Sequence, residues 1–269
     1  KDIANLKAAM AAHGVDRGFM NAASPGVISL FLQNAHYPTR EAYLHALADA
    51  MRDEYRTILD AGLDLQLDCP DLALSRHMLF THLSDDEFLK TAATHVEALR
   101  HALQGLPQDR IRLHICWGNY EGPHVCDIDM AKVFPLLMTV PARYVLFETA
   151  NPRHGHEWTV FRDRAAEIPD DKVLIPGAVD TTTNFVEHPD LVAQRLERFT
   201  NILGTDRVIA GSYPSGPSSF EPPKIRKLIA ENALGAWNLP SGVILDMLRD
   251  AAAKRPGVLT KVGMGTYVD

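Results

Sequence analysis

The sequence has little cysteine, no long apolar run and no excess of basic charge. Only 3 of its 269 residues are cysteines, too few for a disulfide framework in a chain of this length. No stretch reaches the roughly 18 consecutive apolar residues of a membrane span. The formal net charge of −7 disfavours nucleic acid or an anionic membrane as a partner. The first residues lack the basic-then-apolar layout of a signal peptide. We therefore expect a globular cytoplasmic protein that binds neither nucleic acid nor membrane.

Histidine and cysteine are also missing from the last part of the chain. All 12 histidines lie at or before His188, and all three cysteines lie at or before Cys126. Metal binding or acid–base chemistry that depends on these side chains must therefore come from the first two thirds of the chain.

Short apolar runs alternate with longer amphipathic stretches from Gly26 onward. The predicted strands are 27–32, 63–67, 111–116, 144–147, 173–175 and 208–210. Helices are predicted at 41–60, from Ser84 to Gly105, and after Pro189. Each interval between strands can hold a crossover helix, which favours parallel pairing. Six βα units predict an α/β fold of the (β/α)₈ TIM-barrel type, incomplete by two units. A doubly wound open sheet is the alternative, but no glycine-rich phosphate loop follows any predicted strand.

The most informative short pattern is His114-Ile-Cys116. Residues two apart on a strand point to the same face, so both side chains would project together where the strand ends. Active sites of barrels lie at that end, and an imidazole with a thiolate suits zinc. The alternative is a buried cysteine beside a hydrogen-bonded histidine.

Polar residues end or follow the next strand along the chain. Glu148 would lie beside the His-x-Cys pair as a third metal ligand, or would form an ion pair with Arg153. The loop that follows carries His154, His156 and Glu157. Loops after barrel strands are often functional, but each of these histidines is more simply explained as a surface or hydrogen-bonding residue.

Three further residues are candidates for substrate binding or proton transfer. Asp68 ends an apolar run, where a carboxylate needs a cation or a donor, so it either binds substrate or caps a helix. Asp180 and His188 follow the strand at 173–175. A histidine there has a pKa suited to a general acid, although a local hydrogen bond beside a helix start explains His188 equally.

Several stretches together resemble the cobalamin-independent methionine synthase C-terminal superfamily, and most closely its shorter members such as epoxyalkane:coenzyme M transferases. These stretches are 24–29, 65–71, 114–124, 151–158 and 186–192, and the resemblance spans about residues 21–211. It implies a zinc-containing (β/α)₈ barrel in which Zn²⁺ activates a substrate thiol for attack on a methyl group or an epoxide carbon.

Carried over to this sequence, the resemblance makes His114, Cys116 and Glu148 the zinc ligands. It also implies that Asp68 and Asn119 contact the substrate, and that Asp180 and His188 lie in the catalytic, proton-handling loop. Two features depart from the family pattern. The family's last cysteine ligand is absent after 208–211, so the site would either be open or be completed by His124, Cys126 or a loop histidine. No strand is predicted before Ser24, so the family's first two strands have no counterpart.

The end of the chain has a different likeness. Residues 222–232, 236–243 and 255–269 resemble family I CoA-transferases, although that family's catalytic glutamate motif is not recognisable. The sequence therefore predicts a barrel region at 1–212, a linker at 213–221 and a CoA-transferase-like segment at 222–269. We expect this last segment to form a separate unit; the alternative is that it supplies the missing barrel strands.

The leading functional hypothesis is zinc-dependent transfer of a methyl or alkyl group to a thiol; the alternative is a relative whose activity is impaired by loss of the last cysteine ligand. Its partners would be a small thiol and an alkyl or methyl donor, with a homo-oligomer as an open alternative. CoA transfer and a non-catalytic binding protein or fragment are the competing hypotheses.

Overall fold

The structure is a computed structural model that describes residues 1–118, 123–180, 182–183 and 186–211. These residues belong to one compact unit. The predictions for Asn119, for the linker 213–221 and for the segment 222–269 lie outside the described residues. The strands are β1 (Phe19–Ala23), β2 (Asp64–Asp68), β3 (Ile111–His114), β4 (Tyr144–Glu148) and β5 (Val173–Gly177). The α-helices are α1 (Asp2–Ala12), α2 (Pro25–Phe31), α3 (Arg40–Asp60), α4 (Leu74–Met78), α5 (Asp85–Leu103), α6 (Met130–Thr139), α7 (Trp158–Asp163) and α8 (Pro189–Leu203).

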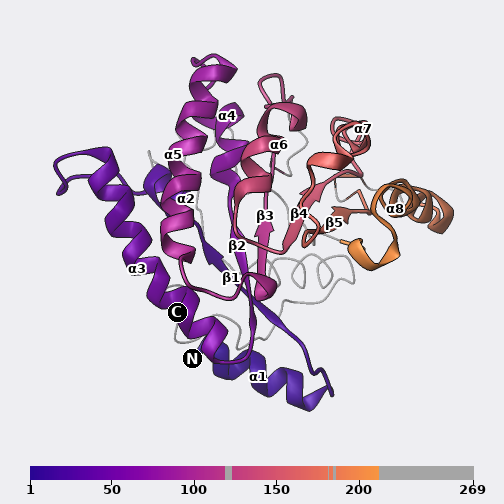
Figure 1. Ribbon diagram of the computed structural model, residues 1–269, viewed down its shortest axis with the longest axis horizontal. Helices are drawn as coiled ribbons and strands as arrows, with labels where there is room; N and C mark the ends of the chain where they lie inside the picture. Colours follow the sequence, from indigo (N-terminus) through magenta and orange to yellow (C-terminus); the bar gives the residue numbers. More distant parts are fainter. Residues whose placement is uncertain (119–122, 181, 184–185, 212–269) are drawn as a thin grey trace, which may run out of the picture. The chain divides into compact units, whose positions relative to one another are not determined.

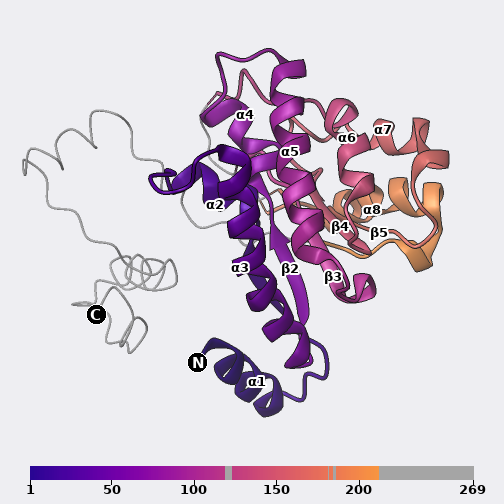
Figure 2. The ribbon, with the colours of Figure 1, turned by 60° about the vertical axis from the view of Figure 1, so that its left-hand side comes forward.

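The five strands form one parallel sheet in the sequential order β1-β2-β3-β4-β5. Residues 208–211 extend it beyond β5 through two parallel bridges, Leu174 with Val208 and Gly177 with Gly211. Helices α3, α5 and α6 lie side by side along one face (Figures 1 and 2). The predicted parallel α/β sheet is thus confirmed. Within the described residues β1 pairs with β2 alone, so closure into a barrel stays a prediction.

The first strand lies earlier than the sequence predicted. Residues 27–32, expected as a strand, fall largely in helix α2, and the strand is β1 instead. Ser24 starts the helix because its Oγ accepts a hydrogen bond from the backbone N of Val27 at 3.0 Å. Pro25 occupies the first turn, where its missing N–H costs nothing. A strand therefore does precede Ser24. The sequence Phe-Met-Asn-Ala-Ala of β1 concealed it, because alanine and asparagine are depleted in strands.

The remaining elements agree with the sequence to within a few residues. Strands β2 to β5 and helices α3, α5 and α8 lie where they were predicted. The capping box of α5 is present: Ser84 Oγ accepts from Glu87 N at 3.3 Å, and a Glu87 carboxylate oxygen accepts from Ser84 N at 2.8 Å. In the part of the chain that the structure describes, no helix is long and apolar enough to cross a membrane.

The two faces of the sheet differ in chemistry. Leu65, Leu67 and Leu113 are fully buried in the core beneath the helices. Their neighbours Gln66 and Arg112 point to the opposite face, because side chains alternate along a strand. There the Arg112 guanidinium donates to Gln66 Oε1 at 2.9 Å. The helix-covered face therefore stabilises the fold, and on β2 and β3 the opposite face carries polar groups.

A buried polar network joins α2, α3 and α5 to the turn after β2. Asp71 Oδ1 accepts from Ser24 Oγ at 2.7 Å, and Asp71 Oδ2 lies 3.1 Å from His95 Nδ1. The Arg40 guanidinium lies 2.9 Å from His95 Nε2. Arginine can only donate, so Nε2 must accept and Nδ1–H must donate to Asp71. Ser24, Asp71 and His95 are each at most 2% exposed, and the network fixes this end of the sheet.

The opposite end of the sheet contains a buried lysine. Lys172, just before β5, is 3% exposed, and its Nζ donates to the carbonyl oxygens of Val140 and Ala142. Burial lowers the pKa of this ammonium group. The Lys172 carbonyl in turn accepts from Arg207 at 3.0 Å. These contacts hold the start of β5 against the segment that leads into β4.

Candidate functional site

Asp68, His114 and Cys116 meet at the carboxyl edge of the sheet. Asp68 and His114 are register partners on β2 and β3, and Asp68 Oδ1 lies 2.6 Å from His114 Nδ1. Cys116 lies two residues beyond His114, the last residue of β3, and its thiol contacts His114. The expected pairing of the imidazole with the thiol is therefore present. Asp68 lies beside them and orients the imidazole, as carboxylates commonly do for metal-binding histidines.

The contacts of His114 determine its protonation. Burial opposes a charge on the imidazole, but the contacts with Asp68 and Cys116 outweigh burial and raise the pKa of His114 to about 9. With these contacts, the imidazole is protonated at neutral pH. Metal binding at His114 would therefore release a proton.

Glu148 ends β4 next to this pair. It comes two residues after Leu146, the register partner of His114, and so lies on the same face of the sheet. Its Oε1 accepts hydrogen bonds from the backbone N of Ala150 and of Asn151. Burial raises the pKa of Glu148, and these two hydrogen bonds partly offset that effect.

The chemistry of the donors suits zinc, but a three-ligand arrangement is not formed. His114 and Cys116 offer nitrogen and sulfur, whereas Glu148 caps the turn that follows it. Among the residues described, no three His, Cys, Asp or Glu side chains are grouped so that they could hold a metal ion. The ligand set His114, Cys116 and Glu148 therefore stays a prediction.

Asp180 and His188 lie on the β5–α8 connection. Asp180 Oδ1 accepts from the backbone N and the hydroxyl of Thr182, at 2.9 and 2.7 Å. His188 is the N-cap of α8, where its Nδ1 accepts from Asp190 N at 3.2 Å, and its side chain is 74% exposed. This local contact is the simpler of the two explanations that the sequence left open. The catalytic roles of both residues stay predictions.

A groove of about 590 Å³ opens at the carboxyl ends of β4 and β5. Asn151 and Gly155 line it from the β4–α7 loop, and Asp180 and Glu187 line it from the β5–α8 connection. Arg195 of α8 closes one side, where it makes hydrogen bonds to both Glu187 oxygens at 2.8 and 2.6 Å. The volume lies within the roughly 300–1,000 Å³ typical of small-molecule sites.

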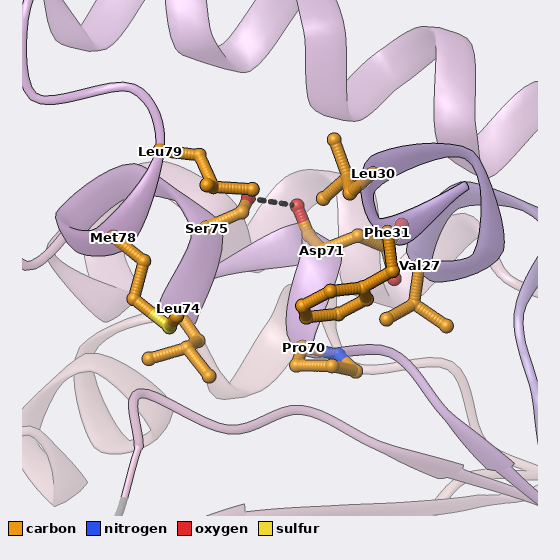
Figure 3. Close-up of a pocket in the computed structure, with 9 residues that line it drawn as sticks. All are labelled: Val27, Leu30, Phe31, Pro70, Asp71, Leu74, Ser75, Met78 and Leu79. Carbon is orange, nitrogen blue, oxygen red and sulfur yellow. Dashed lines mark hydrogen bonds between the residues drawn. The ribbon is translucent and has the colours of Figure 1, made fainter. Parts of the chain in front are cut away.

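A second pocket lies between α2 and α4 and is apolar (Figure 3). It is lined by Val27, Leu30, Phe31, Pro70, Asp71, Leu74, Ser75, Met78 and Leu79. It has room for about one water molecule. It is therefore too small for a substrate.

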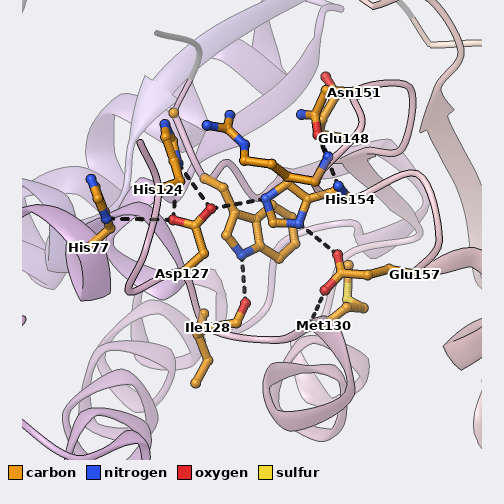
Figure 4. Close-up of polar contacts among 12 residues, drawn as sticks. His77, His124, Asp127, Ile128, Met130, Glu148, Asn151, His154 and Glu157 are labelled. Carbon is orange, nitrogen blue, oxygen red and sulfur yellow. Dashed lines mark hydrogen bonds and ion pairs between the residues drawn. The ribbon is translucent and has the colours of Figure 1, made fainter. Parts of the chain in front are cut away.

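A further set of polar residues lies on the loops after β3 and β4, and the sequence alone did not show that they meet. His154, 4% exposed, lies between the carboxylates of Asp127 and Glu157 (Figure 4). His156 is exposed. The spacing of His154 and Glu157 was visible in the sequence, but Asp127 is distant along the chain and carries no pattern of its own.

Comparison with known proteins supports the fold and a short local likeness. No family model matches the sequence. A stretch of 47 residues is 45% identical to the acetate CoA-transferase YdiF of Escherichia coli K12, covering 18% of this chain and 9% of that enzyme. A stretch of 42 residues is 50% identical to the caffeate CoA-transferase of Acetobacterium woodii, covering 16% and 8%. The chain thus spans less than a tenth of these curated relatives.

The structural comparison covers more of the chain. A B12-independent methionine synthase from Shewanella sp. W3-18-1, solved in complex with selenomethionine, superposes with a TM-score of 0.51 at 20% sequence identity. The match covers 71% of this chain and 53% of that one. The chain therefore spans about half the length of the synthase, and over that part it shares the synthase's fold.

Proposed function

We propose that the protein transfers a methyl or alkyl group to the thiol of a small substrate, at the edge of the sheet where Asp68, His114 and Cys116 meet. The observation that carries the proposal is the Asp68–His114 contact of 2.6 Å, with Cys116 beside it, at the carboxyl end of parallel strands. Side chains at that edge are the reacting groups in enzymes of this architecture. The fold shared with a B12-independent methionine synthase supports the same reaction class.

The chain's own residues bind and orient in this proposal. Asp68 holds His114 Nδ1, so that Nε2 and the Cys116 thiol offer a nitrogen and a sulfur donor. Glu148 is the third metal ligand. To bind a metal, its carboxylate must give up the hydrogen bonds from the backbone N–H groups of Ala150 and Asn151. Zinc bound there would stabilise the thiolate of the substrate. The groove beside Glu148 gives the methyl or alkyl donor room, with Asp180 and His188 proposed to handle protons.

The short CoA-transferase likeness favours a second candidate, the exchange of CoA between acyl groups and carboxylates. It rests on 42–47 residues at 45–50% identity. An assay of acyl-CoA exchange with acetate tests it directly. Turnover there without alkyl transfer would favour this candidate over the first.

Zinc content and thiol alkylation test the first candidate. We expect purified protein to bind about one zinc per chain when the metal is supplied, and Cys116→Ala to lose most of it because the thiolate is lost. Cys69→Ala is the matched control, since Cys69 is a buried thiol outside the proposed ligand set. Zinc occupancy that is unchanged in Cys116→Ala, or alkyl transfer that survives it, would refute the proposed site.

A further inference from the structure

A cluster of imidazoles and carboxylates occupies the loops next to the proposed site. Its members are His77 of α4, His124 and Asp127 of the β3–α6 loop, and His154 and Glu157 of the β4–α7 loop (Figure 4). Asp127 is at the centre: its carboxylate lies 2.9 Å from His124 Nδ1, 3.2 Å from His154 Nε2 and 4.0 Å from His77 Nδ1. The His77 and His124 rings stack with their centroids 4.7 Å apart.

His154 uses both of its ring nitrogens within this cluster. Nδ1 lies 2.9 Å from Glu157 Oε2, and Nε2 lies 3.2 Å from Asp127 Oδ2. Two carboxylates can be satisfied only if both nitrogens carry a proton. Burial opposes that charge, but the two carboxylates outweigh burial and raise the pKa of His154 to about 9. Neither nitrogen is left to bind a metal or to transfer a proton, so the role of His154 is to hold other groups in place.

Each partner of His154 is anchored to a different part of the chain. Glu157 Oε1 accepts from the backbone N of Met130 at 2.8 Å, where α6 begins. The Trp117 ring packs on the His154 ring with centroids 4.6 Å apart, and Trp117 Nε1 donates to the Ile128 carbonyl at 2.7 Å. One charged side chain therefore ties the loop after β3 to the loop after β4.

The same contacts reach the proposed metal ligands Cys116 and Glu148, which follow β3 and end β4. On the β3 side, Trp117 directly follows Cys116 in the sequence. On the β4 side, Asn151 Oδ1 accepts from His154 N at 2.9 Å, and Asn151 N donates to Glu148 at 3.4 Å. A shift of His154 would move the residue next to Cys116 and the turn that holds Glu148.

We propose that His154, held between Asp127 and Glu157, is a positioning residue that fixes the separation of the β3 and β4 ends and thereby of Cys116 and Glu148. The inference rests on the proposed function only in taking Cys116 and Glu148 as metal ligands. A buried charge paired on both sides is well suited to this task, because displacing it takes the same cationic partner away from both carboxylates.

The first test uses metal-free protein. Asp127→Asn and Glu157→Gln keep the shapes of the side chains and remove one carboxylate charge each. The control is Asp49→Asn, which removes the carboxylate charge from the exposed Asp49–His101 pair of 2.7 Å between α3 and α5. The rate at which iodoacetamide alkylates Cys116 is measured by peptide mapping, and the fully buried Cys69 reports unfolding.

We expect Cys116 to react at least about fivefold faster in both cluster variants, with Cys69 unchanged and with no effect in the control. A Cys116 rate within about twofold of the parent, in variants whose Cys69 stays protected, overturns the proposal. Parallel acceleration of Cys116 and Cys69 in both variants also overturns it, because the cluster would then only stabilise the fold.

Zinc affinity gives a second readout, measured by competition with a chromophoric chelator. We expect affinity to fall about 10- to 100-fold in both cluster variants, as for other residues that orient metal ligands. Unchanged affinity overturns the positioning role. If the parent protein binds no zinc, the proposed function fails while the alkylation test still decides the role of His154.

Discussion

Replacing Asp71 tests whether the hydrogen bonds of the buried network stabilise the fold or whether its residues only fill space. Asp71 accepts from Ser24 Oγ and from His95 Nδ1, and all three residues are nearly inaccessible to solvent. In Asp71→Ala, both donors lose their acceptor in a region that water does not reach. In Asp71→Asn, the new amide oxygen still accepts from His95 Nδ1–H, and its NH₂ group donates to Ser24 Oγ.

The two substitutions should therefore differ widely in cost. Each buried donor left without an acceptor costs about 1–3 kcal/mol, so Asp71→Ala should lower the free energy of unfolding by about 2–6 kcal/mol. Asp71→Asn should cost about 1 kcal/mol, because both contacts persist while the charge is removed. A loss at the upper end would approach the whole stability of a typical domain, about 5–15 kcal/mol.

Urea unfolding followed by far-UV circular dichroism measures both values, provided that the dependence of the free energy on urea is the same in each variant. Ser75, whose hydroxyl donates to the Asp71 carbonyl at 2.7 Å, offers a control. That hydroxyl bonds to the backbone and not to the carboxylate, so Ser75→Ala should cost only about 1 kcal/mol. Equal losses for Asp71→Ala and Asp71→Asn would refute the account of the network given above.

Three other substitutions test separate parts of the structure. Gly26→Ala should destabilise the protein even though alanine favours a helix by about 1 kcal/mol, because its Cβ would lie 2.0 Å from Asp71 Oδ2; an increase in the thermal unfolding temperature would contradict this. Ser84→Ala should cost about 0.5–2 kcal/mol through loss of the capping box, which thermal unfolding would reveal as a lowered midpoint. The stability that His154 contributes should be complete below pH 6.5 and vanish as the pH rises through about 9, because its folded pKa is the higher one. The difference in unfolding free energy between the parent and His154→Gln should therefore shrink from about pH 6 to about pH 10, and a constant difference would argue against the double ion pair.

The sequence predicted the elements whose signals are local. Strands β2 to β5 are short apolar runs between clear breaks, and Ser84 with Glu87 marks the start of α5 without reference to the rest of the fold. The error at residues 27–32 has a physical reason. A short apolar run with β-branched residues fits a strand and a short helix equally, and the cap made by Ser24 decides between them.

The candidate site was predictable only where it depends on alternation along a strand or on the pairing of neighbouring strands. The meeting of His114 with Cys116 follows from alternation along β3, and its neighbour on β2 follows from parallel pairing. The double contact of His154 was not predictable, because Asp127 reaches it from a loop 27 residues away along the chain. The hydrogen bond from the backbone N of Ala150 to Glu148 was also not predictable, because it depends on how the chain turns after β4.

The buried lysine before β5 makes the protein its own reporter of unfolding. Among the lysines in the described part of the chain, Lys172 alone is buried. Its ammonium group is enclosed by two carbonyl oxygens, so an amine-directed reagent can reach it only when the start of β5 separates from its neighbours. Lys90 and Lys132 are exposed and would be labelled in the folded protein. The ratio of labelling at Lys172 to labelling at these two would therefore follow the opening of the sheet without any substitution in the protein.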